Sequence, residues 1–209
     1  MAFSTASSYP ALGVAGLPSY HYNTPQFVYQ PTQALRVPGR YEPGVDGPTN
    51  HIRVPQVLHD NGNIDYSSLH RPIRFYRDGF PEPGLKLEDI DRLQPALLSN
   101  HADRVLSSVA ENAINIWIKW PGYPARKKRV STQSGNITRE ALLSSLCKVV
   151  LEWTVEIFRE HPVNHALPEF AIVGRIRPRT MIFITELVHR GASNWQVELW
   201  VPRHDLVFA

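Results

Sequence analysis

Residues 113–146 read AINIWIKWPGYPARKKRVSTQSGNITREALLSSL, and this stretch decides the expected fold. Apolar residues occupy every second position from Ile114 to Trp120. A period of two predicts a strand with one buried face, and Pro121-Gly122 is a strong signal for its end. Four consecutive cations, Arg126 to Arg129, follow before the next element, so their role is the first question that the sequence poses.

The second half of the stretch predicts a long amphipathic helix from Thr138 to about His161. The Thr138 hydroxyl suits an N-cap, and Glu140 places a negative charge in the first turn, where the helix dipole favours it. Pro162 cannot continue the helix. Apolar residues recur at the three-and-four spacing of one helix face, namely Leu142, Leu143, Leu146, Cys147, Val150, Trp153 and Ile157.

Two or three further strands are predicted after the helix, at residues 170–176, 180–189 and 195–201, of which the first is only a candidate. The second is rich in β-branched residues and the third alternates cleanly. The connection between them, residues 190–194, contains Gly191 and is short enough for a hairpin. A strand, a long helix and a meander together predict an α+β domain in which the helix packs on one face of a mostly antiparallel sheet.

The N-terminal half has a different composition. Prolines recur every five to eight residues from Pro10 to Pro55, with tyrosines between them, so residues 1–65 are predicted to form an extended or disordered Pro/Tyr-rich arm. Residues 66–103 are a transitional segment with a short helix near residues 85–93, and a second short helix is predicted at residues 103–112. Residues 104–209 are the predicted compact domain.

Charge follows the same division. Residues 104–209 hold 14 Lys or Arg and 9 Asp or Glu, whereas residues 1–103 hold 8 and 10, so the predicted compact domain is basic.

Motifs for catalysis or cofactor binding are missing from the sequence. Cys147 is the only cysteine, which excludes an internal disulfide and a Cys-rich zinc site, and it is predicted to be a buried helix residue. Pro162 separates His161 from His165, so these cannot form a metal pair on one regular helix face. No Gly-rich phosphate loop or nucleophile elbow is present. We therefore predict no catalytic residue, cofactor or metal, although an enzyme of unrecognised type remains an alternative.

Two basic segments are the candidate binding residues. Clustered cations hold phosphates, and aromatic residues add stacking for single strands. Trp117 and Trp200, which fall opposite the apolar sets of their strands, could stack on bases, or the Pro/Tyr arm could cover them. The run at residues 126–129 also fits a nuclear address or a solvated loop. The candidate nucleic-acid-binding residues are Tyr123, Arg126, Lys127, Lys128, Arg129 and, on one side of an extended segment, Arg175, Arg177 and Arg179.

Three short motifs carry a resemblance to known sequences. They are Trp120-Pro121-Gly122-Tyr123 at a strand end, Ile137-Thr138-Arg139 at a helix start, and Gly191 followed by Trp195, Gln196 and Leu199. Together they resemble a group of uncharacterised proteins from mushroom-forming fungi, over roughly residues 110–200. The resemblance implies an intracellular fungal protein and implies no reaction, cofactor or catalytic residue.

The leading functional hypothesis is a non-enzymatic binding or assembly module that acts through its N-terminal arm and its basic domain. It implies a protein partner, or self-association through residues 1–65. Nucleic-acid binding is the alternative. No segment of the sequence is apolar over the length of a bilayer, and residues 1–17 lack the features of a secretory signal, so we expect an intracellular protein, cytoplasmic or nuclear.

Overall fold

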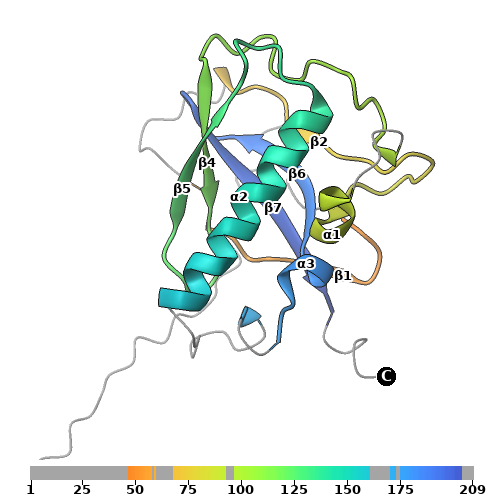
Figure 1. Cartoon of the computed structure of the whole chain (residues 1–209), viewed down its shortest axis with the longest axis vertical. Coiled ribbons are helices and arrows are strands. Elements are labelled where there is room, and N and C mark those ends of the chain that lie inside the picture. Colours follow the sequence, from red (N-terminus) through yellow and green to blue (C-terminus); the bar gives the residue numbers. More distant parts are fainter. Residues whose placement is uncertain are drawn as a thin grey trace, which may run out of the picture. The chain divides into compact units, whose positions relative to one another are not determined.

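In the computed structural model, the described residues are 47–57, 59, 68–92, 97–160, 170–172 and 175–203. They form a seven-stranded mixed sheet with helices packed against it, which confirms the α+β class (Figure 1). Most of the predicted arm, residues 1–46, lies outside the described residues.

The sheet has the strand order β2-β6-β7-β4-β5, with β1 paired to β7 and β3 paired to β6. Only β4 and β7 pair in parallel among these strands, and every other pair is antiparallel. The predicted hairpin is present, because β6 and β7 are joined through Gly191, which has a φ of 89°. The strands are β1 (His51–Arg53), β2 (Ile73–Arg74), β3 (Leu85–Lys86), β4 (Ala113–Ile118), β5 (Arg126–Ser131), β6 (Phe183–His189) and β7 (Asn194–Pro202).

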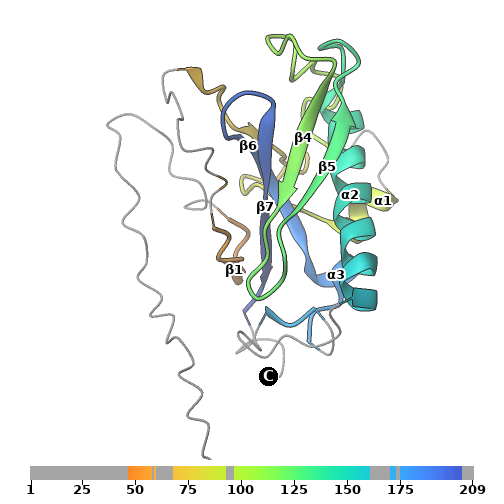
Figure 2. The ribbon, with the colours of Figure 1, turned by 90° about the vertical axis from the view of Figure 1, so that its left-hand side faces the viewer.

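The helices are α1 (Leu87–Asp91), α2 (Arg139–Glu160) and α3 (Pro178–Met181). Thr138 caps α2, since its Oγ1 accepts a hydrogen bond from the Ala141 amide at 3.2 Å. Figure 2 shows all three helices on one side of the sheet and β1 on the other. The core therefore lies between α2 and the sheet, and the opposite face is covered by the segment that contains β1.

Residues N-terminal of position 104 complete this sheet. Strands β2 and β3 both pair with β6, and β1 pairs with the end of β7. One compact unit extends over Gly39–Ala209. The compact domain therefore begins well before residue 104. The sequence pattern does not show this, because the strands that pair with β6 and β7 are short and separated by prolines.

Two predicted elements are wrong. Residues 103–112 contain turns in place of the predicted helix, with Arg104 bridged to Thr138. The described part of residues 170–176 contains no strand. In both segments apolar residues, Leu106 and Val109 in the first and Ile172 and Ile176 in the second, are buried from irregular backbone. The apolar pattern of these two segments therefore reflects buried side chains and not a regular helix or strand.

Candidate functional site

The four cations that open the question are not in a loop, because they form most of β5. Their side chains alternate between the two faces of the sheet. Arg126 and Lys128 lie opposite Ile118 and Ile116 of β4, whose side chains are in the core beneath α2. These two cations therefore lie on the side of the helix.

Both inward cations are neutralised by α2. Arg126 pairs with Glu160, and the Nζ of Lys128 lies 2.5 Å from Oε1 of Glu156. The spacing of the two carboxylates matches the spacing of the two cations. Glu156 and Glu160 are four residues apart, a rise of about 6 Å along the helix, which is close to the rise of two strand residues. Half of the basic run therefore ties the last turns of α2 to the sheet edge.

Lys127 and Arg129 lie on the opposite face and are exposed. The Nζ of Lys127 is 5.7 Å from the ring centroid of Trp117, its neighbour on β4. Neither cation forms an ion pair with any described residue. These two residues are the part of the run that is available to a partner.

β5 is also an edge strand, paired on one side only among the described strands. The Thr132 amide donates to the Asn112 carbonyl at 3.0 Å, which makes this a hydrogen-bonded pair of the β4–β5 ladder. Such pairs alternate along an antiparallel ladder. The amides and carbonyls of Lys127, Arg129 and Ser131 therefore point away from β4, toward the free edge (Figure 1).

The second basic segment does not join the first. Residues 178–181 form helix α3, so Arg179 is not part of an extended run, and its Nη1 lies 2.5 Å from Oδ2 of Asp91 in α1. Helix α1 contacts α2 at Cys147, nine residues before Glu156. Nine residues correspond to a rotation of about 180°, so α1 and β5 lie on opposite flanks of α2. Arg175 and Arg177 are exposed and have no ion pair with a described residue.

None of the three candidate stacking residues presents an open ring. Tyr123 is buried, and its hydroxyl accepts a hydrogen bond from the Ile172 amide. Trp117 is half-buried under the His59 ring, whose centroid is 3.9 Å from its own. Trp200 is buried, and Gly47 lies against its indole. The outward tryptophans are therefore covered by residues of the segment that contains β1.

Sequence reasoning missed a charged cluster on that same face. Glu186 and Glu198 are directly opposite each other on β6 and β7, with 2% and 1% of their surface exposed. Arg53 of β1 binds Glu198 through two parallel contacts of 2.5 and 2.7 Å, and Arg74 lies 3.6 Å from Glu186. The alternation of residues 195–201 indicates that Glu198 and Trp200 share a face, but nothing local indicates that Arg53 meets them.

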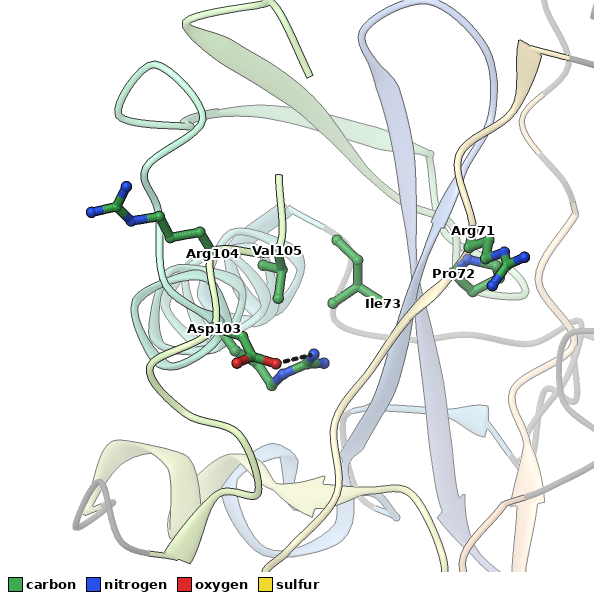
Figure 3. A pocket seen from close by; sticks show the side chains of 7 residues that line it. Arg71, Pro72, Ile73, Asp103, Arg104 and Val105 are labelled. Atoms are coloured by element: carbon green, nitrogen blue, oxygen red, sulfur yellow. Dashed lines mark hydrogen bonds and ion pairs between the residues drawn. The ribbon is translucent and has the colours of Figure 1, made fainter. Parts of the chain in front are cut away.

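An open depression of about 410 Å³ lies beside the N-terminus of α2. Figure 3 shows Arg71 and Arg104 on opposite sides of it. The third cation there, Arg139, already binds the Arg74 carbonyl at 2.6 Å and Asp103 at 3.4 Å. The guanidinium groups do not converge, so the depression offers no organised anion site.

Among the described residues, three titratable groups have shifted pKa values. Burial raises the pKa of the Cys147 thiol to about 11, which makes it a poor nucleophile. Burial also lowers the pKa of His189, whose ring lies 4.8 Å from that of His70. Hydrogen bonds from Thr49 lower the pKa of the exposed Glu82. None of these groups forms a nucleophile–base–orienter arrangement with the others.

The described part of the chain has neither a metal-binding cluster nor a membrane-spanning helix. It contains no group of three His, Cys, Asp or Glu side chains placed to hold a metal ion. Within the same residues, no helix combines the length and apolar character needed to cross a bilayer. His161 and His165 lie outside the described residues.

Comparison of the chain with protein-family models, curated proteins and solved structures found no match.

Proposed function

We propose that this protein is a binding module whose docking edge is β5, and that its partner is a protein that adds an acidic extended segment to this edge. The observation that carries the proposal is the six-residue strand whose outer edge is unpaired among the described strands and is flanked on one face by Lys127 and Arg129. Strand addition of this kind draws affinity from main-chain hydrogen bonds and specificity from the side chains beside them.

Charge favours an acidic partner over a second copy at this edge. Two β5 strands docked on each other would bring the cations of both copies onto neighbouring positions, and like charges on adjacent strands are destabilising. Basic residues on an edge strand are a known protection against such self-pairing. An acidic strand reverses the sign of this interaction and makes each exposed cation favourable.

The inward cations prepare the edge for docking. Because Arg126 and Lys128 are held by Glu160 and Glu156, the strand is fixed against α2 before a partner arrives. An ordered strand needs little further ordering on binding, which lowers the entropic cost of the complex. Exposed charge pairs contribute about 0.2–1 kcal/mol each, so backbone pairing must supply most of the affinity.

Two variants of Arg129 separate the contribution of backbone hydrogen bonds to binding from the contribution of charge. Arg129→Pro removes an outward amide and a cation, and proline is tolerated where the amide faces away from the ladder. Arg129→Gln removes the cation alone. Binding of an acidic, β-prone peptide, measured by isothermal titration calorimetry, should weaken two- to fivefold in Arg129→Gln, consistent with about 0.4–1 kcal/mol. In Arg129→Pro it should be lost.

Nucleic acid is the competing outcome, and the same variants distinguish it. Phosphate contacts depend on charge and give an affinity that falls steeply with salt. If single-stranded DNA or RNA binds, and Arg129→Pro and Arg129→Gln weaken it equally, β5 is a phosphate-binding strand and the proposal is wrong. If the acidic peptide binds wild type and Arg129→Pro alike, the edge is not the docking site.

A further inference from the structure

The face of the sheet opposite α2 contains a row of side chains that suits an extended chain. Trp200, Glu198 and Gln196 occupy alternate positions of β7 and therefore share one face. The parallel register between β4 and β7 places Trp117 beside Gln196 and so extends the row onto the next strand. An aromatic ring lies at each end of the row, with a carboxylate and an amide between them.

Residues 47–57 and 59, which together we call the strap, lie along this row. Gly47 packs on Trp200 so closely that a Cβ there would be 2.2 Å from the ring. Gln196 donates to Oε1 of Gln56 at 2.9 Å, and the Val54 amide donates to the Leu199 carbonyl at 2.9 Å.

Two further contacts of the strap lie within and at the end of the row. Arg53 makes the paired contacts to Glu198, and His59 stacks on Trp117. Together with the contacts of Gly47 and Gln56, these give every member of the row at least one contact with the strap, in the order expected of a strand antiparallel to β7.

The central contact is a demanding one. Glu186 and Glu198 are side by side and almost fully buried, and two neighbouring buried carboxylates repel each other unless cations lie beside them. A guanidinium that binds a carboxylate through two parallel hydrogen bonds is the favoured partner for such a site. Glu198 therefore forms a socket for an arginine on an extended segment.

We propose that this row is a strand-binding groove, which the strap fills within its own chain, and that the groove also accepts the strap of a second copy of this chain. The regular pairing of the strap is only three residues long, His51–Arg53 against the end of β7. A second copy offers the same arginine, glutamine and histidine at the same spacing. Exchange therefore preserves every contact, and the two copies complete each other's sheets.

The charge of β5 is consistent with this arrangement. The cations of β5 disfavour contact between copies there, whereas the groove is acidic and takes up a cation from the strap. The two surfaces are thus chemically distinct, and the groove proposal stands whether or not an acidic segment binds β5.

Disulfide trapping tests the exchange directly. His51 and Pro202 are register partners in a pair that is not hydrogen-bonded, because hydrogen-bonded pairs alternate from Val54 with Leu199. The Cα atoms of such a pair are about 4.5 Å apart, within reach of a disulfide. A chain with both His51→Cys and Pro202→Cys should close an internal disulfide, which checks the register itself.

The decisive sample mixes two differently tagged chains, one with His51→Cys and one with Pro202→Cys. A disulfide-linked heterodimer should form under mild oxidation, with a yield about tenfold above that of a mixture with the exposed Ala110→Cys in place of His51→Cys. If the doubly substituted chain closes its internal disulfide while the mixture gives no more heterodimer than the Ala110→Cys control, the exchange does not occur. Failure of the internal disulfide would overturn the groove itself.

A peptide with the sequence of residues 47–59 tests the arginine socket independently. It should bind the full-length Arg53→Ala protein and bind wild type at least about tenfold more weakly, because the wild-type groove is already filled. A peptide that carries Arg53→Ala should lose about tenfold or more, the loss expected for a buried charge-assisted pair. Equal binding by the two peptides would show that Glu198 selects no arginine.

Discussion

At the residue scale, the lowered pKa of His189 predicts that the stability of the protein depends on pH. Burial lowers its pKa below the ordinary value of 6.5, while its ring accepts a hydrogen bond from the His70 amide and donates to the Ala192 carbonyl at 2.6 Å. Between its folded pKa and 6.5, the unfolded chain binds a proton that the folded chain does not. The contribution of this group to stability is therefore complete above pH 6.5 and is lost as the pH falls through that interval.

The measurement is the free energy of unfolding by urea at pH 7.5 and at pH 5.5. Wild type should be less stable at the lower pH, and His189→Gln, which keeps a donor toward Ala192, should lose less over the same interval. Comparing the two chains removes the contributions of all other groups. Parallel pH dependences in the two proteins would show that His189 is not the group responsible.

At the element scale, prediction from the sequence was most accurate for strands and turns whose structure is determined by a local sequence pattern. Alternation predicted β4 and β7, and the hairpin before β7 followed from its short connection. β5 was not recognised, because a run of four cations resembles a loop unless its carboxylate partners are known. Those partners, Glu156 and Glu160, are 28 and 34 residues away, and only the packing of α2 brings them to the strand.

The candidate sites follow the same division. The sequence identified the basic residues of β5 and the tryptophans that face outward from β4 and β7. It did not identify the Arg53–Glu198 contact, which joins positions 145 residues apart. Long-range pairings of short strands have no periodic signal, since three residues such as His51–Arg53 are too few to define a period.

The N-cap of helix α2 is expected to contribute measurably to the free energy of unfolding. Thr138→Ala removes the hydroxyl that accepts from the Ala141 amide and should reduce the free energy of unfolding by about 1 kcal/mol. Thr138→Ser keeps the acceptor and serves as the matched control, with little change. Urea unfolding monitored by far-ultraviolet circular dichroism measures both. A loss as large in the serine variant would mean that the cap is not the source of the effect.

At the scale of the whole molecule, the sheet is completed by residues distant in sequence, so a fragment 104–209 should not fold. It would lack β1, β2 and β3, which leaves the edge of β6 unpaired and removes both Arg53 and the chain that covers Glu198. Val54, Phe75 and Leu85 would also be missing from the hydrophobic core, and removing one large buried apolar side chain costs about 2–5 kcal/mol, a large part of the stability of a typical domain. A fragment 47–209 retains all seven strands and should fold cooperatively.

The two fragments are compared by the dispersion of their amide NMR signals and by the steepness of thermal unfolding. Fragment 47–209 should give dispersed signals and a sharp transition, and fragment 104–209 should give neither. Adding the peptide of residues 47–59 to fragment 104–209 should not restore the fold, because β2 and β3 remain absent. A folded 104–209 fragment would show that β1, β2 and β3 are not needed for the domain to fold.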